Sequence, residues 1–357
     1  MMSKTLPALL KSTLVMLVLL GSIAGTAKPA AAQASFSSEN LLHNTLSMSM
    51  MLTNMLYHWP GALSLLEEME IIEPSERELD PWKEPRWVLP ERAEWTFVDG
   101  YPIVGTPRVE ELYHTITRYR DARWVRQRYK LNRETLGALN PDVDLDALEE
   151  GDEILVWRHD PSTVSEGLGA PNRGRLRYAE PLPLADKYVV LHRHRSFGTY
   201  YAVSEIKRVF DAYAEAYPDA EPVMMGDLSF RTGRRIRPHL SHQTGRDVDI
   251  TYPRFSAPPN FNRFHYISRR DLDAQRTLWL VREFLASGMV EYIFMDRWVQ
   301  RLVYKEAQRQ GAPQEWLDAV FEYPGWGGRA LVRRSKGHDD HMHIRFWCQK
   351  ETDRWCR

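Results

Sequence analysis

The spacing of hydrophobic residues predicts an alternation of helices and strands in the C-terminal half of the chain. Three segments repeat apolar residues at the period of a helix: 201–217, 268–288 and 297–311. Three others are short and apolar, as buried strands are: 223–230, 291–296 and 341–348. No GxGxxG motif or phosphate-binding loop accompanies them. The pattern predicts an α+β domain over 169–357, with flanking helices on a mostly antiparallel sheet.

A smaller unit is expected over 111–158. Its pattern gives a strand near Tyr113, helices over 122–129 and 133–140, and a closing strand over 153–157. This βααβ order resembles the LysM module, a peptidoglycan-binding fold, in Tyr113 and in the run LGALNPDVDLDALEEGDEILV. The GDT usual after the first strand is replaced by RYRDARW, and a generic α+β spacer is the alternative. A Gly-, Pro- and Ser-containing joint, 160–176, follows.

The N-terminal third has the features of an export signal followed by a linker. Lys4 and Lys11 precede an apolar run too short to span a membrane well, and cleavage is expected after Ala34, which gives a signal peptide over 1–34. An uncleaved signal anchor is the alternative. Residues 35–110 comprise a Met-rich segment and an acidic, Pro-rich linker. Export to the periplasm is therefore predicted, with no stable membrane span after cleavage.

Charge and cysteine content narrow the classes of function. The formal net charge of −1 argues against nucleic acid as a partner, because binding to phosphates needs a basic surface. The chain has 2 cysteines, Cys348 and Cys356. In an exported protein such a close pair most often forms a disulfide, which would fix the C-terminal tail.

Two clusters of metal-binding side chains stand out. In DVDI, Asp247 and Asp249 are two residues apart, so on a strand they point to the same face. In HMHIRF, the same spacing puts His341 and His343 on one face. Gly245 permits a tight turn that would bring His242 towards Asp249. Two imidazoles and one carboxylate leave the fourth position of a tetrahedral zinc ion open, as in catalytic rather than structural sites.

Together these segments resemble the penicillin-insensitive murein endopeptidases. The resemblance rests on GDLSFRTGRRIRPHLSHQTGRDVDITY, GAPNRGRLRYAEPLP, SFGT and HDDHMHIRFWC, and it covers about 169–356. Its specific features are His-x6-Asp followed far downstream by His-x-His. The family groups with D-alanyl-D-alanine dipeptidases and lysostaphin-type enzymes as zinc peptidases. The resemblance implies Zn²⁺ as cofactor and, as substrate, the D-alanyl to diaminopimelate cross-links of peptidoglycan.

Carried over from the family, the zinc ligands would be His242, Asp249 and His343. His239 matches a further family histidine, which would contact this metal, contact a second metal or donate a hydrogen bond. Asp247 would either accept a hydrogen bond from a ligand histidine or pair with Arg246 or Arg234.

The catalytic residues implied by the resemblance are His341, His338 and Asp340. His341 would stabilise the oxyanion, and the preferred order for the general base is His341, His338, Asp340. Asp340 can act only if it lies before the last strand begins, because three residues along a strand reverse the face.

The expected function is hydrolysis of peptidoglycan cross-links by a zinc endopeptidase, with the glycan bound through the LysM-like module. Two alternatives remain. One is a wall-binding protein with a degenerate peptidase domain, and the other is a D-alanyl carboxypeptidase.

Overall fold

The structure is a computed structural model, and it describes residues 87, 89, 92, 97–98, 101–102, 109–350, 353 and 355. These residues belong to a unit that spans Pro85–Arg357. The predicted signal peptide, the Met-rich segment and most of the acidic linker lie outside the described residues. The first described strands are the short pair β1 (Phe97–Val98) and β2 (Tyr101–Pro102).

Residues 111–158 have the predicted order of strand, helix, helix and strand. The elements are β3 (Glu111–Thr115), α4 (Ala122–Tyr129), α5 (Arg133–Leu139) and β4 (Glu153–Arg158). The two strands pair antiparallel. Each helix begins where a side-chain oxygen accepts a backbone N–H, from Trp124 to Asp121 at 2.7 Å and from Thr135 to Asn132 at 2.6 Å. The assignment to the LysM fold stays a prediction.

The segment expected to be a joint contains regular structure. Within it, β5 (Glu166–Ala170) and β6 (Arg173–Arg177) form an antiparallel hairpin. This hairpin was not predicted from the sequence, because its glycines obscure the alternating pattern of a strand. Leu176 and Phe197, which follow the small unit in sequence, belong to the same hydrophobic cluster as its core. Trp157 also donates from Nε1 to the carbonyl of Ala179, at 2.9 Å. The small unit therefore packs directly on the next domain.

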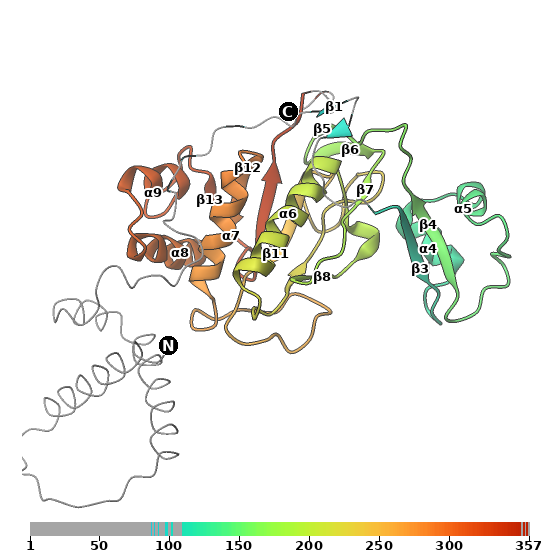
Figure 1. Ribbon diagram of the computed structural model, residues 1–357, viewed down its shortest axis with the longest axis horizontal. Coiled ribbons are helices and arrows are strands. Elements are labelled where there is room, and N and C mark those ends of the chain that lie inside the picture. Colours follow the sequence, from blue (N-terminus) through green and yellow to red (C-terminus); the bar gives the residue numbers. More distant parts are fainter. Residues whose placement is uncertain are drawn as a thin grey trace, which may run out of the picture. The chain divides into compact units, whose positions relative to one another are not determined.

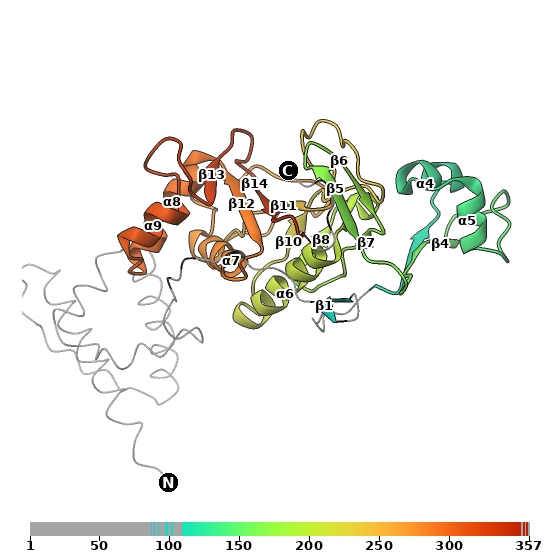
Figure 2. The same cartoon turned by 90° about the horizontal axis from the view of Figure 1, so that it is seen from above.

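The larger domain is built on a six-stranded sheet in the order β13–β12–β14–β11–β10–β8 (Figures 1 and 2). Its strands are β8 (Tyr188–Val190), β10 (Val223–Met225), β11 (Asp247–Thr251), β12 (Val290–Met295), β13 (Val332–Arg334) and β14 (His341–Phe346). The edge pairs β8–β10 and β12–β13 are parallel, and the three central pairs are antiparallel. The predicted α+β class with a mostly antiparallel sheet is confirmed. A small pair, β7 (Glu180–Pro181) with β9 (Phe197–Gly198), and the 3₁₀ turn η2 (Arg193–Arg195) precede the first long helix.

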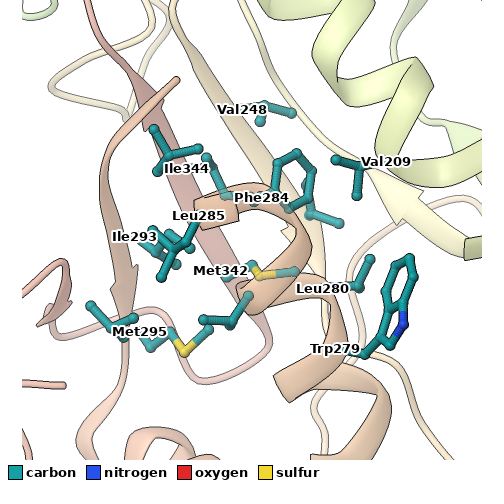
Figure 3. Packing of buried hydrophobic residues seen from close by; sticks show 14 of the residues in the cluster. Val209, Val248, Trp279, Leu280, Phe284, Leu285, Ile293, Met295, Met342 and Ile344 are labelled. Atoms are coloured by element: carbon teal, nitrogen blue, oxygen red, sulfur yellow. The ribbon is translucent and has the colours of Figure 1, made fainter. Parts of the chain in front are cut away.

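Four helices accompany this sheet among the described residues of the domain: α6 (Tyr200–Ala216), α7 (Ala274–Ala286), α8 (Arg297–Arg309) and α9 (Gln314–Val320). Figure 2 shows α6 and α7 on the same side of the sheet. From α7, Phe284 and Leu285 point at Val248 and Ile344 of the central strands (Figure 3). These four side chains are at most 3% exposed and form part of one large hydrophobic cluster. This cluster fixes one face of the sheet and leaves the other for polar residues.

Two predicted boundaries are wrong, and each difference has a local cause. The helix expected over 268–288 begins only after Asp273, whose side chain accepts the backbone N–H of Arg276 at 2.9 Å and so caps it. The strand expected over 223–230 ends at Met225. Its continuation leaves the ladder at Gly226, whose N–H still donates to the carbonyl of Asp249 at 2.8 Å.

None of the helices in the part of the chain that the structure describes is long and apolar enough to cross a membrane. Cys348 lies among the described residues and Cys356 lies outside them, so the predicted disulfide stays a prediction.

Candidate metal centre

Strands β11 and β14 place acidic and basic side chains in register on one face. Asp249 pairs with His343, Asp247 with Arg345, and Thr251 with His341. Residues directly opposite each other in a ladder share a face, so these side chains lie together. The intervening Val248, Ile250, Met342 and Ile344 are 0% exposed on the core side. We call the side that carries Asp247, Asp249, His341, His343 and Arg345 the polar face.

The loop before β11 brings His242 back onto the polar face. Gly245 has φ +71°, and a Cβ atom there would lie 2.9 Å from the Cα of Gly198 and from the backbone N of Thr199. Only glycine fits this position, so the turn is set by the sequence. His242 itself has φ 64° and is fully buried. A bulky residue in this left-handed conformation is strained, and such strain is often found at functional sites.

The ring of His242 is oriented by a backbone carbonyl. Its Nδ1 lies 3.1 Å from the carbonyl oxygen of Leu228, to which it donates as an N–H. In the neutral ring, Nε2 then carries a lone pair, and it lies 3.3 Å from Oδ2 of Asp249. This Nε2 is buried and has no hydrogen-bond partner among the described residues. A buried acceptor left in this way is costly unless another group, such as a cation, occupies the site.

His239 completes the tightest group of candidate ligands. Ligand atoms of His239, His242 and Asp249 all lie within 4.8 Å of one another. Nδ1 of His239 is 3.6 Å from Oδ2 of Asp249, and its Nε2 is 3.3 Å from Oδ2 of Asp227. The His-His-Asp group can bind a metal ion, because imidazole nitrogen and carboxylate oxygen are the donors that zinc and similar cations take.

His343 lies beside this group but faces two carboxylates. Its Nδ1 is 3.0 Å from Oδ1 of Asp249, and its Nε2 is 2.9 Å from Oδ1 of Asp247. Its ring centroid is 4.7 Å from that of His242. Burial disfavours the imidazolium, but the hydrogen bonds and charges of the two aspartates outweigh this and raise the pKa of His343 to about 9. The centre therefore stabilises positive charge.

The aspartates respond in the opposite direction. Burial would raise the pKa of Asp249, but His242 and His343 hold that pKa well below its usual value. For Asp247, burial is likewise outweighed, chiefly by Arg345 and His343, and its pKa is lowered. Nε of Arg345 donates to Oδ1 of Asp247 at 2.7 Å. The sequence left two roles open for Asp247. The structure shows it in contact with His343, a candidate ligand. Among the described residues, no ion pair joins Asp247 to Arg246 or Arg234.

The three predicted catalytic residues lie together at the start of β14. Asp340 immediately precedes the strand, which begins at His341, and its Oδ1 lies 2.6 Å from Nδ1 of His341. Nε2 of His341 is 3.8 Å from Oδ1 of Asp249. The ring of His338 is 4.8 Å from that of His341. Burial, followed by the charges of His341 and His343, lowers the pKa of His338 to about 4.

Sequence reasoning missed two residues that touch the centre. Asp227 is buried and contacts His239, and it also accepts from Nη1 of Arg195 at 3.1 Å. Phe264 lies with its ring 5.1 Å from that of His341. The polar Asp227 inside the apolar run VMMGDLSF was a usable signal, because a carboxylate is rarely buried without a partner. No local pattern indicated Phe264, because it is brought in by the loop 253–272.

The C-terminal half of the chain is similar to a known family. Residues 167–357 match the family described as penicillin-insensitive murein endopeptidase. Proteins with that name are similar to this chain, including one from Escherichia coli (strain K12 / DH10B) and one from Shigella boydii serotype 18. Each is 25% identical over 207 residues, which is 53% of this chain and 68% of the relative. The matched region contains every candidate residue of the centre.

Proposed function

Because the chain belongs to the penicillin-insensitive murein endopeptidase family, we propose that it is an exported zinc peptidase that hydrolyses peptide cross-links in peptidoglycan, of the D-alanyl to diaminopimelate type. One observation carries the proposal. Ligand atoms of His239, His242 and Asp249 lie within 4.8 Å of one another, on the polar face of a sheet in the family's matched region. The names of the relatives support cleavage of peptide bonds in peptidoglycan.

The residues that would hold the metal are His242, Asp249 and His343, with His239 as a further ligand. The fit is supported by Nε2 of His242, which is buried without a hydrogen-bond partner among the described residues and lies 3.3 Å from Oδ2 of Asp249. When bound, a zinc ion brings the pKa of water towards ~7 and polarises a peptide carbonyl. Asp247, which contacts His343 and the backbone N–H of His242, would orient both.

His341 is the residue best placed to act on the substrate. Asp340 engages its Nδ1, so Nε2 is the nitrogen that faces the centre. From there His341 donates a hydrogen bond to the oxygen that becomes negative in the tetrahedral state, or carries a proton to the leaving amine. For the general base, the order of candidates is His341, then His338, then Asp340. The side chain of His341 is 13% exposed, which leaves it accessible to a substrate.

The remaining parts of the chain fit the same role. We propose that the protein acts in the periplasm after cleavage near Ala34, which rests on the charged and apolar pattern of the first 34 residues. We also propose that 111–158 is a LysM-like module that binds the glycan. The antiparallel pairing of Glu111–Thr115 with Glu153–Arg158 around two helices supports this assignment.

The test is digestion of purified, cross-linked muropeptides with a mass-spectrometric readout. Wild type is compared with a chelator-treated sample, with the same sample after zinc is restored, and with Asp249→Asn. The control is Asp211→Asn, an exposed carboxylate on α6 that pairs only with Lys207 among the described residues. We expect wild type and the control to convert dimers to monomers, and Asp249→Asn to be at least about 100-fold slower. Elemental analysis of each sample measures the bound metal.

Each other outcome has a definite meaning. Undiminished cleavage by metal-free protein would contradict the zinc assignment. Loss of terminal D-alanine without conversion of dimers would identify a carboxypeptidase. Retention on peptidoglycan without any cleavage would favour the wall-binding alternative.

A further inference from the structure

The polar face continues beyond the metal centre onto two neighbouring strands. In the ladder between β12 and β14, Phe294 pairs with His343, and in the ladder between β12 and β13 it pairs with Arg333. Paired residues share a face, so Arg333 lies in the same cross-strand row as His343. Strands are spaced by about 4.8 Å, which puts the backbone of Arg333 about 10 Å from that of His343.

The guanidinium of Arg333 lies over an aromatic ring. Its Cζ lies 3.5 Å from the ring centroid of Tyr292, which is on the polar face because it pairs with Arg345. Its Nε donates to the carbonyl of Ala330 at 3.0 Å. The cation–π contact and this hydrogen bond both restrict the guanidinium. An arginine ordered in this way loses little further freedom when it binds a ligand.

Arg333 has no acidic partner among the residues that the structure describes. No ion pair within 4.0 Å and no hydrogen bond from its Nη atoms is found there. Burial raises the pKa of Glu291, next to Tyr292 on the same strand, and outweighs the charge of Arg333, which Glu291 feels; among the described residues no ion pair within 4.0 Å joins the two. Arg345, in contrast, already donates to Asp247. The two Nη groups of Arg333 therefore remain available for a ligand.

We propose that Arg333, stacked on Tyr292, binds a free carboxylate of the stem peptide about three residues from the bond that is cleaved. This inference rests on the proposed function. Two parallel N–H donors match the two oxygens of a carboxylate. An extended peptide advances about 3.3 Å per residue, so the distance of about 10 Å between the backbones of Arg333 and His343 corresponds to about three residues. Phe294, between Arg333 and His343, would form the apolar floor beneath that stretch of peptide.

The experiment uses one cross-linked muropeptide in two forms, with its stem carboxylates free and with them converted to amides. For each form kcat and KM are measured with wild type, Arg333→Gln and Arg333→Lys. The matched control is Arg301→Gln, because Arg301 is an exposed arginine on α8. Thermal unfolding of every variant checks that the fold is retained.

We expect wild type to favour the free carboxylate about 10- to 100-fold in kcat/KM, as a charge-assisted hydrogen bond predicts. Arg333→Gln should abolish this preference through a higher KM for the free form, with kcat unchanged. Arg333→Lys should restore part of it, since lysine keeps the charge but not the two-point geometry. Arg301→Gln should behave as wild type.

Four results would overturn the inference. If wild type cleaves neither form, the proposed function fails together with it. If wild type cleaves both forms equally, or if folded Arg333→Gln keeps the preference, the carboxylate site is wrong while the endopeptidase function stands. If Arg333→Gln lowers kcat equally for both forms, its role is structural.

Discussion

The two faces of the central sheet differ completely although they share the same strands. On one face Val248, Met342 and Ile344 are fully buried and pack under α7. On the other, alternate residues of the same strands, Asp249 and His343, meet at a centre that stabilises positive charge. Because the side chains of a strand alternate, one stretch of backbone supplies both the packing and the chemistry. The comparison predicts that a substitution on the apolar face lowers stability with little effect on the metal centre. A substitution on the polar face should lower activity with little effect on stability.

The largest effect on stability is expected from Phe284→Ala on the apolar face. Phe284 is 0% exposed and contacts the rings of Phe210 and Phe346. Its loss removes buried surface and leaves a cavity, so the free energy of unfolding should fall by about 3–5 kcal/mol. Urea denaturation measures this. The protein that remains folded should bind metal as wild type does, and a parallel loss of metal from folded protein would contradict the independence of the faces.

Phe294→Ala makes the matched change on the polar face. Phe294 is only partly buried, and its ring lies 5.5 Å from that of His343. We expect the free energy of unfolding to fall by only about 1 kcal/mol, the size of an aromatic contact.

The effect of Phe294→Ala on activity should be larger than that of Phe284→Ala when both are compared per folded molecule. Steady-state cleavage of muropeptides under conditions where both variants are folded measures this. An equal loss of stability in the two variants would remove the distinction between the faces.

A further prediction concerns the loop 253–272, which brings Phe264 against His341. Asp271 anchors this loop by accepting from Arg254 and from the backbone N–H of Ser256. Burial would raise the pKa of Asp271, but the hydrogen bonds from Ser256 and the contact with Arg254 outweigh it and lower that pKa. The stabilisation is therefore fully present above the unfolded-state pKa of about 3.9 and is lost as the pH falls through the folded-state pKa.

Asp271→Asn should accordingly cost about 1–2 kcal/mol at pH 7, and the difference from wild type should shrink as the pH approaches 3. Urea denaturation at pH 7, 5 and 3 measures it, with Asp211→Asn as the control for an exposed carboxylate. A difference that is constant across this range would mean that the charge of Asp271 does not anchor the loop.

The fold class, the βααβ order and the two candidate clusters were predictable because each depends on local periodicity. The period of two in DVDI and HMHIRF fixes which residues share a face whichever strands they pair with. The parallel edge pairs, the helix α9 and the hairpin β5–β6 were not predicted, because pairing depends on partners that are distant in sequence. Glycines obscured the hairpin, and Gly226 ended a strand that the apolar run had extended.

For the centre, the sequence by itself determined the chemical types of the donors and the strand faces from which they project. Tertiary structure alone decided that His239, with His242 and Asp249, forms the tightest group, whereas His343 lies between two carboxylates. It also supplied Asp227, Phe264 and the row that leads to Arg333. The physical reason is that periodicity acts over a few residues, whereas the distance between side chains about 100 residues apart is set by how the sheet packs and how its loops close.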